Sequence, residues 1–348
     1  MLFIYNSIMR PPEAFLTTEQ IKSFQNSQYV LFGHAATKVC HWTKSSLKKG
    51  VQCYKNQFYG ITSHQCVQMT PIVNYCGENC VFCWRHLNSA KPSIEQAEDA
   101  KEIVRESIKA QLKMLQGFGA QKAQIGEEKW QEAMHPRHVA ISLTGEPTSY
   151  IHISTLIEEY HKLGMSTFVV SNGLNPEVLQ QMTMPTQLYI SLETVTPEMH
   201  KKINVPIEKN SWQKLMKTLE ILPTLKTRTV VRVTAVKGLN TQFPKELGEL
   251  VAIAKPMFLE IKSYMHIGQS RKRLERENMM SMKELKEFGD AIALTAGYSF
   301  KDESKKSLVA LYVRNDLKDQ DTKIDFAPIE AMKIEELPTL HEKISLKI

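Results

Sequence analysis

The chain has 348 residues, of which 42% are hydrophobic, and a formal net charge of +7 at pH 7. That length can bury one large core with appended segments. No run of about 18 apolar residues is present, so we expect no membrane span, and the N-terminus lacks the basic start and cleavage site of a signal peptide.

Short apolar runs predict six strands with helical patterns between them. The predicted strands cover residues 68–73, 139–143, 167–170, 188–192, 228–236 and 258–264. Apolar residues at helical spacing and capping residues predict helices that begin near Ser93, Ile151, Ser211, Lys245 and Ser281. One more strand is expected at 308–313.

Strands that alternate with helices favour parallel β/α units joined by right-handed crossovers. Six such units predict an α/β fold, namely a partial (β/α)6 TIM-like barrel over residues 68–314. Residues 1–67 are then an N-terminal extension that wraps the barrel mouth, and residues 315–348 a C-terminal extension. Catalytic residues should lie at the C-terminal ends of the strands.

Cys76, Cys80 and Cys83 follow the first predicted strand with the spacing C-x3-C-x2-C. A structural zinc site usually takes four ligands, commonly as two C-x2-C pairs. An iron–sulfur cube held by three cysteines keeps one iron open for a small chelator, as radical S-adenosylmethionine (SAM) chemistry requires. The spacing favours such a cluster over three structural or zinc-bound cysteines.

Three further cysteines precede that motif at equal intervals of 13 residues: Cys40, Cys53 and Cys66. Six cysteines confined to residues 40–83 indicate metal chemistry in a reducing, cytoplasmic compartment rather than a disulfide framework. Thiolates favour iron–sulfur clusters or zinc, so the upstream three suggest a second metal site. The alternative is three buried and inert cysteines.

Polar residues follow three of the predicted strands. Gly145 and Glu146 come after the second strand, and this Gly-Glu resembles the motif that binds the SAM amino group in radical SAM enzymes. Asn172 follows the third strand, and Ser191 and Glu193 follow the fourth. These side chains could hold SAM, although each could instead cap a helix or stabilise a loop.

Basic residues are segregated along the chain. No acidic residue lies between Gln20 and Gly77, and a second basic run spans 271–276. Such a surface suits a polyanion such as RNA, although it could be a solvated lysine-rich face. The candidate phosphate contacts are Lys48, Lys49, Arg271, Lys272, Arg273 and Arg276. Aromatic residues near the cysteines could stack on RNA bases or pack in the core: Trp42, Tyr54, Phe58, Tyr59 and Trp84.

Six stretches carry a close resemblance to a known family: 53–61, 63–69, 80–85, 143–148, 171–177 and 258–274. The chain resembles the archaeal-type tRNA 4-demethylwyosine synthases, radical SAM enzymes of wyosine biosynthesis. The resemblance implies SAM and two [4Fe–4S] clusters as cofactors. It implies that Cys76, Cys80 and Cys83 hold the SAM cluster, and that the second cluster is held by Cys40, Cys53 and Cys66.

The family's substrates are tRNA-Phe with N1-methylguanosine 3′ of the anticodon, and pyruvate as carbon donor. The resemblance implies a carbon–carbon lyase that builds the tricyclic base 4-demethylwyosine. Lys55 lies two residues after Cys53 and is our candidate for a Schiff base with pyruvate. It could instead contact phosphate or lie on the surface.

Two departures from the family pattern change what is expected. Glu193 stands where the family pattern predicts an aspartate, which puts a specific sugar contact there in question. The flavodoxin-like reductase domain of eukaryotic relatives is absent, so we expect an external donor of the flavodoxin or ferredoxin type. Nothing in the sequence demands more than a monomer.

Two other functions compete with this interpretation. A radical SAM methylthiotransferase also pairs three upstream cysteines with this motif, but it spaces them more widely and adds a C-terminal RNA-binding barrel. A zinc-stabilised RNA-binding protein would not be an enzyme, and it would be colourless where two iron–sulfur clusters give a brown protein.

Phosphate contacts by the candidate lysines and arginines predict salt-sensitive tRNA binding. The logarithm of the binding constant should fall with the logarithm of salt concentration, by roughly 0.7 to 0.9 for each contact. Filter binding at several KCl concentrations measures this slope, and a flat response would contradict the assignment.

Overall fold

A computed structural model of the protein describes residues 9–73, 75–85 and 97–339. In that part of the chain ten strands form one sheet, in the order β1-β2-β3-β4-β5-β6-β7-β8-β10-β9. The strands are β1 (Val30–Phe32), β2 (Ala35–Thr37), β3 (Cys66–Thr70), β4 (His138–Ile141), β5 (Ser166–Ser171), β6 (Gln187–Ser191), β7 (Arg228–Ala235), β8 (Phe258–Ser263), β9 (Tyr298–Ser304) and β10 (Val309–Arg314).

The α-helices of the described residues alternate with these strands from α4 onward, whereas α1 to α3 precede β3. They are α1 (Thr18–Asn26), α2 (His41–Lys49), α3 (Tyr54–Tyr59), α4 (Ala100–Gln116), α5 (Lys122–Ile125), α6 (Glu127–Ala133), α7 (Ile153–Lys162), α8 (Pro176–Gln181), α9 (Pro197–Ile203), α10 (Ser211–Ile221), α11 (Pro244–Ala254), α12 (Met282–Ala296) and α13 (Ala327–Glu330).

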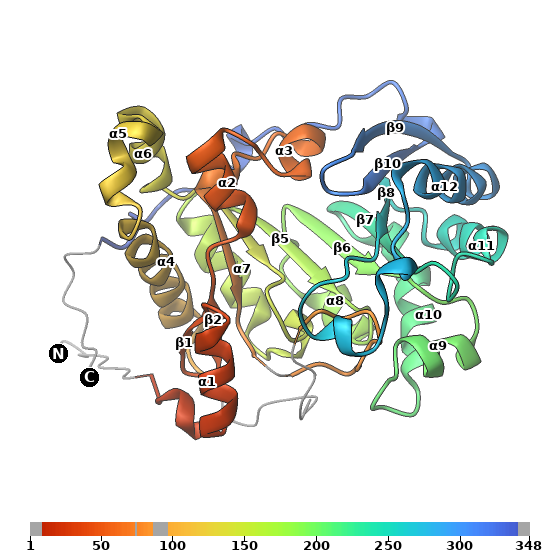
Figure 1. Ribbon diagram of the computed structural model, residues 1–348, viewed down its shortest axis with the longest axis horizontal. Coiled ribbons are helices and arrows are strands. Elements are labelled where there is room, and N and C mark those ends of the chain that lie inside the picture. The colour runs from red at the N-terminus through yellow and green to blue at the C-terminus, as the bar shows by residue number, and fades with distance from the viewer. Residues whose placement is uncertain (1–8, 74, 86–96, 340–348) are drawn as a thin grey trace.

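The six central strands, β3 to β8, are parallel and confirm the predicted barrel strands. The sheet does not close on itself. β2 and β1 extend it antiparallel beyond β3, and β10 and β9 extend it antiparallel beyond β8 (Figure 1). The partial barrel is therefore confirmed. The proposed boundary between residues 67 and 68 falls inside β3, and β1 and β2 belong to the same sheet.

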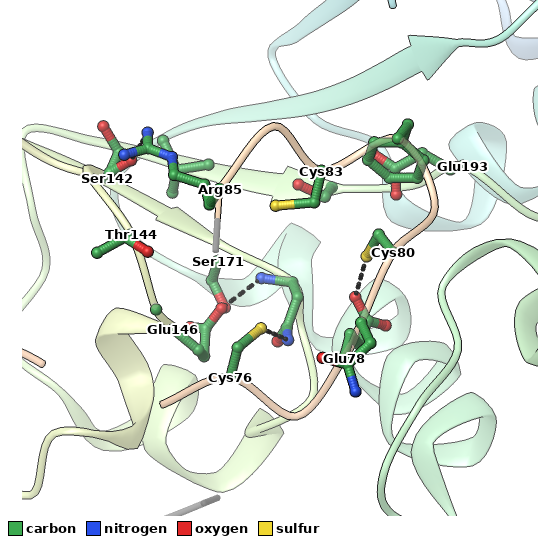
Figure 2. A pocket seen from close by; sticks show the side chains of 16 residues that line it. Cys76, Glu78, Cys80, Cys83, Arg85, Ser142, Thr144, Glu146, Ser171 and Glu193 are labelled. Carbon is green, nitrogen blue, oxygen red and sulfur yellow. Dashed lines mark hydrogen bonds between the residues drawn. The ribbon is translucent and has the colours of Figure 1, made fainter. Parts of the chain in front are cut away.

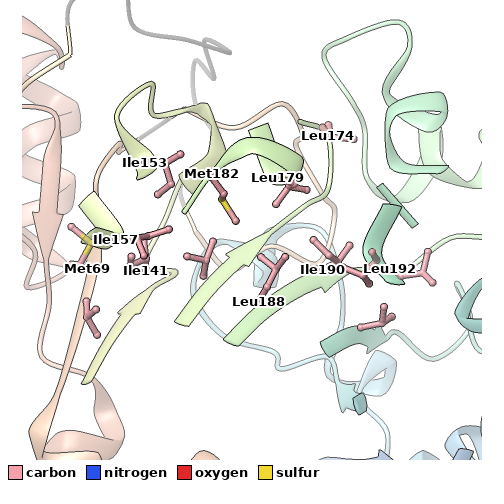
Figure 3. Packing of buried hydrophobic residues seen from close by; sticks show 14 of the residues in the cluster. Met69, Ile141, Ile153, Ile157, Leu174, Leu179, Met182, Leu188, Ile190 and Leu192 are labelled. Atoms are coloured by element: carbon pink, nitrogen blue, oxygen red, sulfur yellow. The ribbon is translucent and has the colours of Figure 1, made fainter. Parts of the chain in front are cut away.

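Alternate residues of the central strands face the outer helices. Ile141, Leu188 and Ile190 pack in one buried cluster with Ile157 of α7 and Leu179 of α8 (Figure 3). Each such side chain contributes about 1.5–3 kcal/mol when it is fully removed from water. This period of two fixes the strand register, since a slip of one residue would turn the apolar set inward.

The intervening residues face the barrel interior. Phe168 of β5, Tyr189 of β6 and Phe258 of β8 form a second buried cluster with Phe58 and Tyr59 of α3. The helix α3 therefore packs into the barrel interior, and Figure 1 shows it above the central strands.

The helix expected to open at Ser93 begins later in the structure. Its proposed first residue lies outside the described residues, and α4 begins at Ala100 with the Asp99 side chain accepting from the N–H groups of Lys101 and Glu102. An aspartate at this position satisfies helix N–H groups that otherwise lack partners. No helix among the described residues is long and apolar enough to cross a membrane.

Candidate active site

The loop after β3 brings three cysteines to one cavity at the C-terminal ends of the parallel strands. Cys76, Cys80 and Cys83 line this cavity, and Figure 2 shows their side chains around it. Also lining it are Arg85, Gly145, Glu146, Asn172, Ser191 and Glu193. All five residues predicted to contact SAM therefore share the cavity with the C-x3-C-x2-C cysteines.

Backbone hydrogen bonds fix the cysteine loop to the segment after α9. The N–H of Asn79 donates to the carbonyl of Val205 at 3.0 Å, and that of Val81 to the carbonyl of Ile203 at 2.9 Å. The loop is thus anchored on both sides of Cys80. It presents its thiols from a fixed backbone.

Gly145 forms a turn directly beneath the start of that loop. Its φ is +67°, and a Cβ there would lie 2.1 Å from the carbonyl oxygen of Ile72. The next peptide N–H, of Glu146, donates to the carbonyl of Tyr75 at 2.6 Å. Only glycine fits this close approach, which gives the predicted Gly-Glu motif a physical reason in this chain.

Glu146 is held in place by donors from two strand ends. Its carboxylate, 3% exposed, accepts from the N–H of Thr148 at 3.0 Å and from the N–H of Asn172 at 2.8 Å. The Asn172 side-chain amide in turn lies 3.7 Å from the Cys76 sulfur. Burial raises the pKa of Glu146, against these hydrogen bonds, which lower it. The contacts join the ends of β4 and β5 to the cysteine loop.

Glu193 lies 2% exposed in the same cavity. Burial raises its pKa to about 7, while hydrogen bonds from Thr234 and Asn204 lower it. The group can therefore be neutral or ionised near physiological pH. Its predicted contact with SAM, and that of Ser191 at the end of β6, stay predictions.

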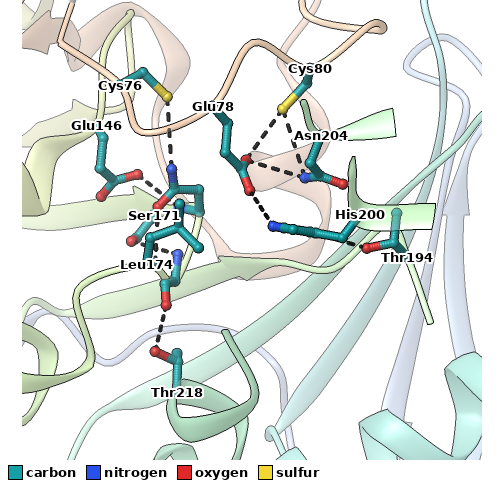
Figure 4. A network of polar contacts seen from close by, with 12 residues as sticks. Cys76, Glu78, Cys80, Glu146, Ser171, Leu174, Thr194, His200, Asn204 and Thr218 are labelled. Carbon is teal, nitrogen blue, oxygen red and sulfur yellow. Dashed lines mark hydrogen bonds and ion pairs between the residues drawn. The ribbon is translucent and has the colours of Figure 1, made fainter. Parts of the chain in front are cut away.

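The sequence analysis missed a buried polar network behind Cys80. One oxygen of Glu78 lies 3.3 Å from the Cys80 sulfur and 3.2 Å from the Asn204 amide nitrogen, and the other lies 3.5 Å from Nε2 of His200 (Figure 4). Burial raises the pKa of Glu78 to about 8. Burial thus favours the neutral form of Glu78 beside the Cys80 sulfur. Glu78 could have been suspected from its place inside the motif, but His200 and Asn204 carry no local signal.

The donor set of the cavity suits a cluster better than a single ion. Among residues 9–73, 75–85 and 97–339, no three His, Cys, Asp or Glu side chains are grouped closely enough to hold one metal ion. Four ligands converging on one point are what structural zinc needs. In an iron–sulfur cube each thiolate binds a different iron, so the thiols surround a space, as these three do.

The upstream cysteines lie at the starts of three neighbouring elements. Cys40 precedes α2, Cys53 precedes α3, and Cys66 begins β3. The Thr43 hydroxyl of α2 donates to the carbonyl of Ser63, and the Cys53 N–H donates to the Ser63 hydroxyl, both at 2.9 Å. Burial raises the pKa of Cys40 and Cys66, and each of these thiols also responds to the charge on Cys53. The two Ser63 contacts tie the starts of α2 and α3 to the turn that leads into β3.

All six cysteines are free of disulfides. Arg85 lines the same cavity as Cys76, Cys80 and Cys83. Its guanidinium donates to the carbonyl of Ser142 at 2.8 Å and lies 3.8 Å from the Trp84 ring centroid. The charges of both Cys83 and Cys40 act on its pKa, which burial lowers.

Lys55 is buried in the barrel interior beside the upstream cysteines. It is 9% exposed, and its ammonium lies 4.6 Å from the Phe168 ring centroid and 4.5 Å from that of Tyr189. Burial lowers the pKa of Lys55, and the Arg232 charge lowers it further. The alternative of a plain surface lysine is wrong, because the interior encloses this side chain.

The residues predicted to contact RNA differ in how exposed they are. Lys48, Lys49, Arg271, Lys272 and Arg276 are exposed, so they remain available for phosphate. Of the aromatic residues, Tyr54, Phe58 and Tyr59 are buried in the barrel interior, which leaves Trp42 and Trp84 partly exposed.

Arg273 has a structural contact that the sequence did not reveal. Its guanidinium donates to the carbonyls of Val81, at 3.0 Å, and Cys83. The adjacent Gly268 lies so close that a Cβ would be 2.3 Å from the carbonyl oxygen of Trp84. The segment 268–273 therefore clamps the second half of the cysteine loop.

Comparisons with known proteins agree with this geometry. A profile described as "Radical SAM superfamily" matches residues 70–251, and one described as "Wyosine base formation" matches residues 253–314. The chain is 42% identical to an S-adenosyl-L-methionine-dependent tRNA 4-demethylwyosine synthase of Pyrococcus abyssi, over 87% of this chain and 90% of that protein. A protein of the same name from Pyrococcus horikoshii is also 42% identical, over 88% and 92%.

The fold resembles a solved structure described as "Structure of TYW1 with a lysine-pyruvate adduct bound". The TM-score is 0.82 at 34% sequence identity, over 89% of this chain and 99% of that one.

Because Arg273 holds the cysteine loop and Arg271 does not, we predict that their substitution affects the rate of SAM cleavage differently. Arg273→Ala removes donors to two loop carbonyls and should slow SAM cleavage about fivefold in the absence of tRNA, the equivalent of about 1 kcal/mol. Arg271→Ala, an exposed matched control, should leave this rate unchanged. The release of 5′-deoxyadenosine measures it, and equal rates in both variants would contradict the clamp.

Proposed function

Because the chain belongs to the S-adenosyl-L-methionine-dependent tRNA 4-demethylwyosine synthases of the radical SAM superfamily, we propose that it converts N1-methylguanosine beside the anticodon of tRNA-Phe, with pyruvate, to 4-demethylwyosine. The observation that carries this proposal is a cavity lined by three free thiols at the strand ends of a barrel that also encloses a lysine.

The first cysteine group would hold the SAM cluster. Cys76, Cys80 and Cys83 would be its ligands, and Gly145 and Glu146 would face the SAM amino group from the end of β4. When bound, the cluster and SAM supply a 5′-deoxyadenosyl radical that abstracts hydrogen from the N-methyl group of the substrate. Asn172, Ser191 and Glu193 line the same cavity and would hold the remaining polar groups of SAM.

The second cysteine group would hold a further [4Fe–4S] cluster through Cys40, Cys53 and Cys66. Lys55 would then bind pyruvate as a Schiff base, in which the amine displaces the carbonyl oxygen as water. Burial lowers the pKa of Lys55 and so favours the neutral amine that such an attack needs. The lysine–pyruvate adduct named for the similar solved structure supports this assignment.

The reaction places further demands on the chain and its partners. The base would leave the anticodon loop to enter the barrel mouth, as flipped bases do in other nucleobase enzymes. Loss of the pyruvate carboxylate makes the enzyme a carbon–carbon lyase. A flavodoxin or ferredoxin would supply electrons to a monomer, and the six free thiols suit the reducing cytoplasm.

The product assay tests this proposal directly. Reconstituted protein incubated anaerobically with SAM, pyruvate, reductant and methylated tRNA-Phe should yield a tricyclic nucleoside, detected by mass spectrometry after tRNA digestion. Unchanged N1-methylguanosine under conditions in which SAM is cleaved would contradict it.

The role of Lys55 has its own test. With pyruvate and borohydride, the wild-type protein should gain the mass of pyruvic acid less one oxygen atom, and Lys55→Ala should not. Lys286→Ala is the matched control, because Lys286 also lies over an aromatic ring, 4.4 Å from the Phe300 centroid, but on the surface. Trapping that survives Lys55→Ala would rule Lys55 out.

A further inference from the structure

The barrel interior holds three cations close together. Arg232 of β7 lies 4.4 Å from the Tyr189 ring centroid, the same ring that Lys55 contacts at 4.5 Å. Arg232 also donates to the Tyr54 hydroxyl at 2.6 Å, and the ammonium of Lys262 lies 5.2 Å from the Tyr54 ring centroid. Two aromatic rings thus connect Lys55, Arg232 and Lys262.

Strand register explains why Lys262 faces this space. Glu260 pairs with Arg232 across β8 and β7, and Lys262 pairs with Thr234 one step closer to the C-terminal ends of the strands. Residues two apart on a strand share a face. Leu259 and Ile261 belong to the outer cluster, so Lys262 points into the barrel with Glu260.

Only one of the three cations has a carboxylate partner. Glu260 is 0% exposed and accepts from Arg232 at 2.9 and 2.7 Å through one oxygen, and from the Tyr59 hydroxyl at 2.7 Å through the other. Among the described residues, no carboxylate lies within salt-bridge distance of Lys55 or Lys262. Lys262 instead donates to the Ser307 carbonyl at 3.2 Å, which orients its ammonium.

This excess positive charge calls for anions. Burial and the Arg232 charge lower the pKa of Lys262 to about 8, so an anion beside its ammonium would favour the charged form. A [4Fe–4S] cluster held by the three upstream thiolates would carry roughly one negative charge. That charge would offset the ammonium of either Lys55 or Lys262. One further small anion would balance the other.

We propose that Lys262 binds the carboxylate of the α-oxo acid whose carbonyl carbon reacts with Lys55, and so selects an oxo acid over neutral carbonyl compounds. This inference rests on the proposed function and adds a specificity residue to it. Ammonium groups bind carboxylates through short, charge-assisted hydrogen bonds. With one N–H on Ser307, Lys262 keeps two others for the substrate. Arg232 is held by Glu260 and Tyr54 through its Nε and Nη2 groups and lies over the Tyr189 ring.

The test is borohydride trapping without tRNA or SAM, on the reconstituted full-length protein, with pyruvate as the probe. Lys262→Met should raise the pyruvate concentration for half-maximal adduct by roughly 10- to 100-fold. Lys262→Arg should restore most of that loss, and the surface control Lys286→Met should match the wild type.

Pyruvamide, which has the same shape without the charge, separates charge recognition from packing. Lys262→Met should trap pyruvamide at the same concentration as the wild type does, but it should need more pyruvate for half-maximal adduct. An equal loss of both compounds, or trapping of pyruvate at wild-type concentrations, would overturn the inference. Lys262→Gln, which can still donate to Ser307, replaces Lys262→Met if iron content or circular dichroism shows that the latter is unfolded.

The outcomes distinguish the two levels of the argument. The wild-type protein could trap pyruvate and make the tricyclic nucleoside while Lys262→Met traps pyruvate at the same concentrations. That result would contradict the inference and leave the proposed function intact. A wild-type protein that forms no adduct contradicts both.

Discussion

The alternation of side chains along β5 to β8 is the constraint on which the site depends. Apolar residues at every second position must face the outer helices, because only there can they leave water. The intervening positions are then forced inward, whatever their chemistry. Tyr189 and Glu260 are buried by this rule together with Lys55 of α3, and Arg232 and Lys262 are half-buried beside them. The chemistry of the interior is thus a consequence of the packing outside it.

The ends of the same strands build the other half of the site. Parallel strands end at one edge, so the turns after β4, β5 and β6 meet beneath the cysteine loop. The close contact between Gly145 and Ile72 sets the height of that loop, and Arg273 holds its far side. The two cysteine groups flank one barrel because Cys66 begins β3 and the motif follows it only a few residues later.

The sequence predicted the parts of this arrangement that are local. The six barrel strands and the cavity side chains at strand ends follow from periodicity and spacing, to within a few residues, whereas the role of the upstream cysteines came from the family resemblance. Contacts between distant segments were not predictable. Arg273 looks like any residue of a basic run, and only the fold shows it bound to Val81 and Cys83, about 190 residues away. Glu78 contacts His200 of α9 and Asn204, the residue that ends this helix, and both are far from Glu78 in the sequence.

The strands at the edges of the sheet were also not predictable from their local sequence. β1 and β2 are three residues each, too short for a pattern of alternating polarity to show. β9 carries polar and charged residues on its exposed stretch, so its sequence does not indicate a strand. It forms because β10 offers it backbone hydrogen bonds. Strand pairing there depends on tertiary context that a single segment does not contain.

The account requires two open cubes in one chain, and iron and sulfide analysis of anaerobically reconstituted protein tests that most directly. It predicts about eight of each per chain in the wild type, and about four in a variant with Cys40, Cys53 and Cys66 replaced by alanine, since each cube holds four. About four of each in the wild type, unchanged by those replacements, would contradict it.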